Sequence, residues 1–213
     1  MSKENRARGL LIVPAYNEAA SIAGVVHDLK KHVPAFDVVV IDDGSTDATA
    51  ANVPQGARVI RLPFNLGIGG AMQTGYRCAA MEGYEVAVQV DGDGQHRGDQ
   101  VSKLIDRLEA GGADLVIGSR FLGAGEYRQS AARAAGSGVL RAMLRLLTGR
   151  AFTDCTSGFR AANRLIIEAF AHWYPEDYPE PEVVLLLCRA GFNIVEVEVS
   201  MNTRAGGRSS IPF

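Results

Sequence analysis

Val86-Ala-Val-Gln-Val-Asp91-Gly-Asp93-Gly-Gln95 decides the fold, because here an apolar strand carries two carboxylates, one residue apart, at its carboxyl end. Alternation along an extended chain points residues i and i+2 to the same side, so Asp91 and Asp93 are expected to close on one hard cation. Gln95 continues this series, and its amide oxygen is a further candidate ligand. His96 points the other way, as a residue of the turn. The pattern predicts an Mg²⁺ or Mn²⁺ site for a diphosphate.

The metal-binding interpretation has a simple alternative. A D-x-D sequence also occurs as surface acids in a glycine-rich turn, so the two carboxylates alone leave both interpretations open. A calcium-binding EF-hand is excluded, because its loop requires Gly at the sixth position and Glu at the twelfth. His96 and Ser102 occupy those positions here.

The composition is that of one globular domain. The chain has 213 residues, of which 47% are hydrophobic, and this is enough for a sizeable core. Its net charge of −2 gives no general attraction to nucleic acid, so any attraction to a membrane must come from a local patch. Cys78, Cys155 and Cys188 are far apart and odd in number, which favours reduced thiols over disulfides or a zinc site. No signal-like segment and no run of roughly 18 apolar residues occurs. A cytoplasmic protein is expected, either soluble or peripheral at the cytoplasmic face of the membrane.

Apolar strands alternate with amphipathic helices in the first half. Strands are expected at residues 10–13, 38–41, 58–62, 86–90 and 115–117, and apolar residues have helical spacing at 22–29 and 101–108. Repeated strand–helix units with continuously apolar strands predict an α/β fold with one mostly parallel central sheet and helices on both faces.

Ligands bind at the carboxyl ends of the strands in such sheets. Polar residues follow the predicted strands at those ends, and all are expected to converge on one edge: Asn17, Glu18, Asp42, Asp43, Asn65, Asp91 and Asp93.

The second half has a less regular pattern. Helices are expected at 130–148, 165–170 and 181–190, the last with Pro at its first turn, and a strand at 157–161. Residues 193–199 alternate apolar with acidic side chains, as in a half-buried edge strand. No repeat, low-complexity segment or linker interrupts residues 1–213, which favours a single domain with two functional halves.

Asp42-Asp43-Gly-Ser-Thr-Asp47 follows the second predicted strand and begins a helix. Ser45 or Asp47 can serve as an N-cap, but two adjacent acids exceed what capping requires. A base or ribose is a plausible partner for the surplus, because carboxylates accept N–H and O–H hydrogen bonds.

Asn65-Leu-Gly-Ile-Gly69-Gly-Ala opens the next helix, and its glycines let the backbone approach a ligand or a neighbouring element. Met72 stands where G-x-G-x-x-G requires its last glycine, so a dinucleotide-binding Rossmann domain is not expected.

Residues 130–148 place Arg133, Arg141 and Arg145 on one helical face, with leucines and Met143 around the rest. The pattern fits an ordinary core-packed helix with a solvated basic face. It also fits a helix at a membrane surface, where arginines meet lipid phosphates and leucines dip inward.

Taken together, these residues resemble family 2 glycosyltransferases of the GT-A fold, nearest the dolichol-phosphate mannose synthase and polyprenyl-phosphate hexosyltransferase group. The matching motifs occur in order along nearly the whole chain, which is far more specific than any one short motif. They are V-P-A-Y-N-E at 13–18, D-D-G-S-T-D at 42–47, N-x-G-x-G-G-A at 65–71, D-G-D-G-Q-H at 91–96, G-S-R-F at 118–121, D-x-T-S-G-F-R at 154–160 and R-x-x-G-x-S at 204–209.

The resemblance implies roles for particular residues. The nucleotide-sugar site would comprise Pro14, Ala15, Tyr16, Glu18, Asp42, Asp43, Asn65, Gly69 and Asp91. Asp91, Asp93 and Gln95 would hold Mg²⁺ or Mn²⁺ and, through it, the donor diphosphate. Arg120 and Arg204 are similar to the family's phosphate-facing arginines, with Arg208 a further candidate. Asp154 corresponds to an acidic residue near the acceptor, and Glu180 and Glu182 lie in the acidic segment that follows.

The resemblance also implies an activity. The chain would be an inverting, metal-dependent enzyme that moves a hexose from a GDP- or UDP-sugar to a polyprenyl phosphate, with Asp93, Asp154, Arg120 and Arg204 as catalytic residues. Its nucleotide-sugar half would span about residues 9–120 and its acceptor half about 121–213. A phosphate acceptor, with a second pKa near 6, needs no base at neutral pH, whereas a hydroxyl acceptor would use Asp154 as its base.

Many relatives continue into transmembrane helices, whereas this sequence ends at Phe213. A separate membrane partner or a non-lipid hydroxyl acceptor therefore stays open. A haloacid dehalogenase-type phosphatase also uses D-x-D, but places it at its first strand and has Thr or Val where this chain has Gln95. A non-catalytic nucleotide-sugar-binding module is the other alternative, and the retained D-x-D argues against it.

Overall fold

The computed structural model describes residues 7–123, 131–176 and 179–202, and the structural statements below concern this part of the chain. It contains a seven-stranded sheet with the strand order β3-β2-β1-β4-β6-β5-β7. The strands are β1 (Gly9–Ala15), β2 (Asp37–Asp42), β3 (Arg58–Arg61), β4 (Val86–Gln89), β5 (Leu115–Ser119), β6 (Arg160–Asn163) and β7 (Ile194–Glu198). β6 is antiparallel to β4 and β5, and the other paired strands are parallel. The predicted mostly parallel α/β sheet is confirmed.

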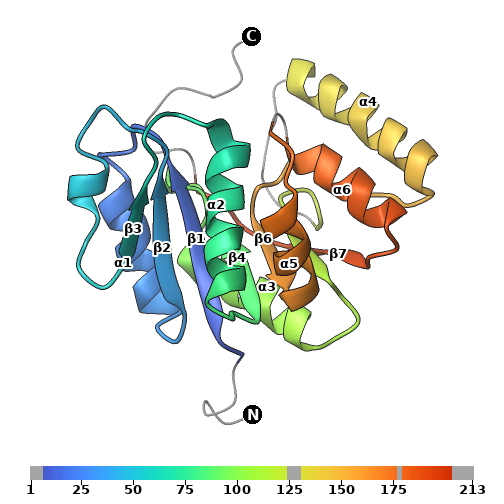
Figure 1. Cartoon of the computed structure of the whole chain (residues 1–213). Coiled ribbons are helices and arrows are strands. Elements are labelled where there is room, and N and C mark those ends of the chain that lie inside the picture. Colours follow the sequence, from blue (N-terminus) through green and yellow to red (C-terminus); the bar gives the residue numbers. More distant parts are fainter. Residues whose placement is uncertain (1–6, 124–130, 177–178, 203–213) are drawn as a thin grey trace.

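Helices cover both faces of this sheet (Figure 1). α1 (Ile22–His32) and α3 (Gly98–Glu109) pack on one face, and α2 (Gly67–Met81), α5 (Arg164–His172) and α6 (Pro179–Arg189) pack on the other. α4 (Ala131–Thr148) lies against the outer side of α6. No helix in the described ranges is long and apolar enough to cross a bilayer.

The apolar spacing that predicts α1 and α3 also identifies their buried faces. One stripe per helix is removed from solvent, and burying such a stripe supplies most of the stability of a helix of this length. The buried residues are Ile22, Val25, Val26 and Leu29 in α1, and Val101, Leu104, Ile105 and Leu108 in α3.

Several predicted elements differ from those observed. β6 begins at Arg160 and not at residue 157, because the preceding residues form turns in which the Ser157 hydroxyl accepts the Phe159 N–H. α6 begins at Pro179, two positions before the predicted start. A short 3₁₀ turn (Ala50–Asn52) takes the place of the helix expected after Asp47. β7 pairs only with β5 within the described sheet, so the predicted edge strand is confirmed.

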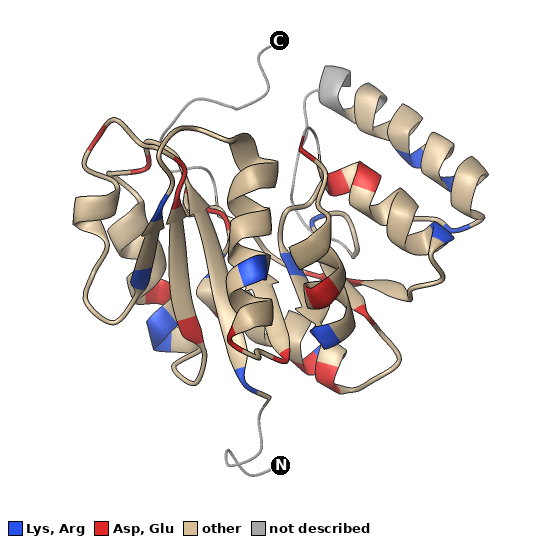
Figure 2. Ribbon diagram, viewed as in Figure 1, with Lys and Arg blue, Asp and Glu red and all other residues tan. Residues whose placement is uncertain are grey.

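The topology brings distant segments to one edge of the sheet. β1, β2, β3 and β4 are parallel, so the loops after them lie on the same side. Because β6 is antiparallel to β4, with Arg160 beside Gln89, the loop before β6 lies at this edge too. Figure 2 shows acidic residues along this edge and at the start of α6. The predicted convergence of the loops is confirmed.

Candidate active site

The D-x-D carboxylates lie just beyond β4, which ends at Gln89. The prediction that an extended strand aligns them is wrong, because residues 92–94 form a turn and Gly94 has a φ of 79°. Asp93 is buried, and its Oδ1 accepts the backbone N–H of Gln95 at 2.9 Å. The Asp91 side chain keeps 36% of its surface exposed. The turn therefore presents one accessible and one buried carboxylate at the sheet edge.

His96 fixes this turn, a role that the sequence did not indicate. Its ring is buried and stacks on Phe159, with ring centroids 4.6 Å apart. Its Nδ1 accepts the backbone N–H of Asp91 at 2.9 Å, and its Nε2 lies 3.6 Å from Asp91 Oδ2. A neutral ring with its proton on Nε2 satisfies both contacts. Gly158 closes the other side, since a Cβ there would lie 3.2 Å from Asp91 Oδ1.

The turn fits a divalent metal bound together with a diphosphate. No group of three or more His, Cys, Asp or Glu side chains forms a complete metal cage within the described ranges. Mg²⁺ does not require one, because it is usually bound by one or two carboxylates, several waters and substrate phosphates. Asp91 is partly exposed, its neighbour Asp93 carries a second carboxylate, and Gln95 follows in the same turn.

The two acids at the carboxyl end of β2 both have structural partners. Asp42 Oδ1 accepts the Ser45 N–H, while the buried Oδ2 accepts no hydrogen bond from the described residues, although Arg61 Nε lies 3.3 Å away. Asp43 Oδ1 accepts the Leu66 N–H at 2.7 Å, at the start of α2. Burial raises the pKa of Asp43 above its ordinary value, and the N–H groups of Leu66 and Gly67 oppose this rise. Both carboxylates therefore already accept hydrogen bonds or lie beside a cation within the protein, and less of their acceptor capacity is left for a ligand than we expected from the sequence.

The loop after β1 is locked against the loop after β2. Asn17, at a φ of 55°, donates its N–H to Ser45 Oγ and accepts the Thr46 N–H on its own Oδ1. The Glu18 N–H donates to Thr49 Oγ1 at 2.8 Å. These reciprocal bonds make the two loops one rigid platform.

The candidate nucleotide residues lie at different depths on this platform. Pro14 and Ala15 are buried, and the Ala15 carbonyl accepts the Asp43 N–H. Tyr16 is 46% exposed, and Glu18 is partly exposed. The Tyr16 side chain is therefore accessible to a ligand, whereas Pro14 and Ala15 lie beneath the surface.

The start of α2 borders the platform. Asn65 is exposed, and its Oδ1 accepts the Gly67 N–H. A Cβ on Gly69 would lie 2.2 Å from the Pro175 carbonyl oxygen, so the absence of a side chain lets α2 approach the segment before α6. Gly69 thus contacts a neighbouring element, one of the two interpretations that its sequence left open.

Arg120 and Asp154 form an ion pair at the end of β5. Arg120 Nε lies 2.7 Å from Asp154 Oδ2 and Nη2 lies 2.8 Å from Oδ1, and the Arg120 backbone N–H also donates to Oδ2. The Asp154 side chain is fully buried, whereas Arg120 keeps 17% of its surface exposed. The Arg120 side chain therefore stays partly accessible, while its guanidinium is held by the buried carboxylate.

A buried cation, Arg160, lies under the same edge and was not among the predicted site residues. Its Nη2 donates to the Glu180 carbonyl at 2.7 Å, and its Nε to the Ser157 carbonyl. Its Nη1 has no hydrogen-bond partner among the described residues. Burial raises the pKa of Glu180 above its usual value, and the Arg160 charge opposes this rise.

Arg204 and Arg208 lie outside the described residues. The chain leading to them is nevertheless attached to the D-x-D turn. The Asn202 N–H donates to the Gln95 carbonyl and its Nδ2 donates to the Gly94 carbonyl, while Met201 bridges to His96.

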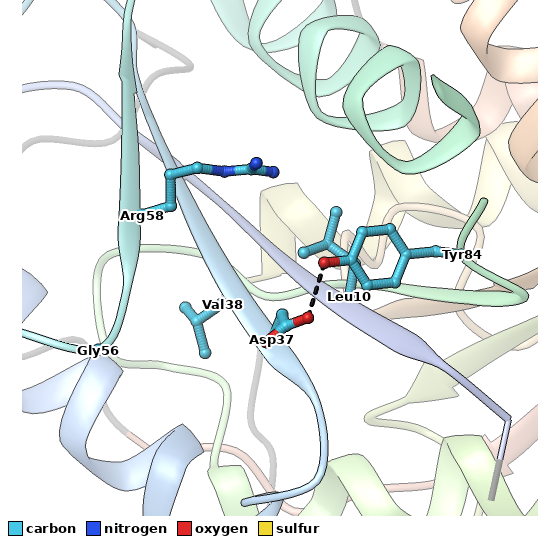
Figure 3. Close-up of a pocket in the computed structure, with 6 residues that line it drawn as sticks. All are labelled: Leu10, Asp37, Val38, Gly56, Arg58 and Tyr84. Atoms are coloured by element: carbon cyan, nitrogen blue, oxygen red, sulfur yellow. Dashed lines mark hydrogen bonds between the residues drawn. The ribbon is translucent and has the colours of Figure 1, made fainter. Parts of the chain in front are cut away.

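A pocket occurs at the other edge of the sheet (Figure 3). It is lined in part by Asp37 and Arg58, the first residues of β2 and β3, and Tyr84 donates a hydrogen bond to Asp37 Oδ2 at 2.7 Å. Because it lies at the amino ends of these strands, it is separate from the D-x-D edge.

Comparison with known proteins gives consistent matches. Residues 10–170 match the family model "Glycosyl transferase family 2". The chain is 32% identical to polyprenol monophosphomannose synthase of Mycolicibacterium smegmatis, over 96% of this chain and 81% of the relative. It is 33% identical to undecaprenyl-phosphate mannosyltransferase of Micrococcus luteus, over 96% of this chain and 87% of the relative.

A solved structure supports the same fold. It is glucosyl-3-phosphoglycerate synthase from Mycobacterium tuberculosis in complex with Mn²⁺, uridine diphosphate and glucosyl-3-phosphoglycerate, with a TM-score of 0.70 and 24% identity over 93% of this chain and 73% of that chain. The family match and the two relatives exclude the phosphatase alternative. The chain belongs to glycosyl transferase family 2 and is a glycosyltransferase with the GT-A fold.

Proposed function

We propose that the chain transfers a hexose from a GDP- or UDP-sugar to a polyprenyl phosphate, with inversion at the anomeric carbon. The substrates named for the two mannosyltransferase relatives support this acceptor. The observation that carries it best is the ion pair at Asp154. Both of its oxygens accept hydrogen bonds from Arg120 and the side chain is fully buried, so this carboxylate is engaged inside the protein and is not presented to an acceptor hydroxyl. A phosphate acceptor, already ionised at neutral pH, needs no such base.

The donor side is assigned to the platform and the D-x-D turn. Tyr16, Glu18 and Asp43 would hold the nucleoside, and Asp91, Asp93 and Gln95 would hold Mg²⁺ or Mn²⁺ with the diphosphate. When bound, the ion supplies positive charge to the leaving diphosphate. Arg120 adds further positive potential from the side of the acceptor, with Arg204 and Arg208 proposed for the same task.

One observation favours a second candidate, a hydroxyl acceptor. The pKa of Glu180 is raised by burial, and its charge interacts with those of Arg160, Asp91 and Arg120. A carboxyl group with a raised pKa is a suitable general base. In that case Glu180 would take the role that the resemblance implies for Asp154.

Transfer assays with a panel of GDP- and UDP-hexoses and a short polyprenyl phosphate test the proposal. We expect one donor to give a sugar-linked lipid that partitions into butanol, and its formation to require a divalent cation. Absence of product with every donor, in a preparation that binds a nucleoside diphosphate, would contradict the proposed acceptor.

Asp43→Asn should weaken donor binding without loosening α2. The Asn Oδ1 can still accept the Leu66 N–H, whereas the negative charge is lost. We expect the donor dissociation constant to rise by a factor corresponding to about 1.5–3 kcal/mol, the range for hydrogen bonds to charged groups. Calorimetry with the nucleoside diphosphate measures this change. Unchanged affinity would remove Asp43 from the site.

We further propose that α4 rests on the cytoplasmic face of a membrane, directly or beside a membrane partner protein. Val139, Met143, Leu146 and Leu147 follow one another at helical spacing and are exposed, Leu146 by 86%. The predicted arginine face contributes less than expected. Arg141 Nη1 donates to the Thr153 carbonyl, only Arg145 is described as exposed, and the Arg133 side chain lies outside the described residues.

Replacing Met143 and Leu146 together by Gln should release the protein from vesicles. Burial of one such side chain is worth about 1.5–3 kcal/mol, so we expect at least roughly tenfold weaker binding. Sedimentation with vesicles of an anionic phospholipid measures it. Leu165→Gln, at another exposed apolar residue on α5, is the matched control and should bind as the wild type does. If the wild type, the double variant and Leu165→Gln bind vesicles equally, α4 does not contact the membrane.

A further inference from the structure

The edge strand β7 carries an acid that the sequence assigns to a solvated face. In the structure, Glu196 instead binds the loop before β6. Its Oε2 accepts the Thr153 N–H at 2.8 Å, and its Oε1 accepts the Thr153 hydroxyl at 3.0 Å and the Asp154 N–H at 2.7 Å. The carboxylate therefore fixes two successive residues of that loop.

The second of those residues holds Arg120. The Asp154 carboxylate accepts hydrogen bonds from the backbone N–H, Nε and Nη2 of Arg120. The loop is also attached to β5, since the hydroxyls of Ser119 and Thr153 lie 2.7 Å apart. A continuous path of contacts thus leads from Glu196 through Asp154 to the guanidinium at the sheet edge.

Charge and shape both matter at position 196. The groups that contact the carboxylate are all donors, and a carboxylate offers acceptors only. A Gln of the same size would turn its NH₂ group toward one of them and would lose the strengthening that an ionised acceptor gives.

We propose that Glu196 is a positioning residue for sugar transfer, which sets the direction of the Arg120 guanidinium through Asp154. The proposal rests on the proposed function, in which Arg120 adds positive potential from the side of the acceptor. Glu196 itself does not contact substrate. It fixes the position of the loop before β6, and this loop in turn fixes the position of the Arg120 guanidinium.

Glu196→Gln tests this directly. We expect kcat/KM for polyprenyl phosphate to fall roughly 10- to 100-fold, as for the loss of a hydrogen bond to a charged group, with most of the effect in the acceptor KM. The dissociation constant of the nucleoside diphosphate should stay within about twofold, because the donor platform lies at β1 and β2. Glu168→Gln on α5, which removes a carboxylate paired with Arg164, is the control and should leave both unchanged.

Two further measurements separate positioning from general loosening. In the double variant Arg120→Lys/Glu196→Gln, kcat/KM for polyprenyl phosphate should fall no further than in Arg120→Lys alone. Both changes affect the same interaction. Hydrogen exchange, which needs no substrate, should become faster at the amides of Thr153, Asp154 and Arg120. Thr153→Val, which removes a single hydroxyl from the same network, replaces Glu196→Gln should that variant fail to fold.

The outcomes are distinct. Faster exchange at Arg120 together with a non-additive loss supports the proposal. Exchange that is faster at 153–154 but unchanged at Arg120, or an additive loss in the double variant, overturns it. If the exchange result holds but the wild type transfers no sugar to polyprenyl phosphate, the positioning of Arg120 stands and the proposed acceptor fails.

Discussion

Asp91→Asn should lower kcat for sugar transfer by about 10²- to 10³-fold, the loss found when one group that stabilises charge in the transition state is removed. The substitution keeps the shape of the side chain but removes a charged oxygen ligand. Nucleoside diphosphate binding in the presence of Mn²⁺ should weaken as well. The fold should persist, since the Asp91 contact with His96 through its backbone N–H is retained. Initial rates, calorimetry and thermal unfolding measure the three quantities.

Asp99→Asn provides a matched control for this change. Asp99 lies in the first turn of α3, is partly exposed and pairs with Arg97. Its replacement should leave transfer unchanged at saturating Mn²⁺. Wild-type rates in Asp91→Asn, or full wild-type activity in excess EDTA, would show that the turn holds no catalytic metal.

Arg120→Met should impair both stability and transfer. The Asp154 side chain is fully buried, and removing its partner leaves an unpaired charge in the interior. Breaking a buried ion pair in this way costs about 3–5 kcal/mol, so the midpoint of urea unfolding should fall markedly. Arg120→Lys keeps the charge but not the two-pronged contact, and its stability should lie in between.

Arg164→Met is the control for the stability effect. Arg164 Nε also contacts a carboxylate, that of Glu168, but both side chains are well exposed. An exposed pair is worth about 0–1 kcal/mol, so the unfolding midpoint should barely change. If Arg120→Met and Arg164→Met unfold at the same urea concentration, the ion pair between Arg120 and Asp154 does not contribute the stability inferred for it.

Most of the fold could be predicted because its signals are local. Apolar spacing along α1 and α3, and continuously apolar runs in β1 and β2, reflect which side chains face the sheet. The start of β6 was misplaced because local hydrophobicity was the only signal used for it. Residues 157–159 follow a turn at 155–156, and the Ser157 hydroxyl accepts the Phe159 N–H, a bond that hydrophobicity does not report.

The site was less predictable because its geometry depends on contacts between distant residues. Asp43 and Leu66 are 23 positions apart, Arg120 and Asp154 are 34 apart, and Glu196 and Thr153 are 43 apart. No spacing rule along the chain connects such pairs. The order of the motifs along the chain identified the sheet edge and its carboxylates. It did not show which carboxylates are held by hydrogen bonds or ion pairs within the protein.

His96 and Glu196 illustrate what was missed. Both are ordinary residues for their positions, one in a turn and one on an edge strand. Only the stacking of His96 on Phe159 and the hydrogen bonds that Glu196 accepts give them roles. No pattern along the chain indicated the role of His96, and the alternation of β7 indicated none for Glu196.

The most direct test of the account compares two acceptors of equal chain length, a polyprenyl phosphate and the corresponding polyprenol, with the same donor. We expect product with the phosphate alone, and we expect kcat/KM to fall as the pH drops below about 6, where the acceptor phosphate takes up its second proton. Equal or faster transfer to the polyprenol would contradict this expectation, because the nucleophile would then be a hydroxyl and the site would require a base.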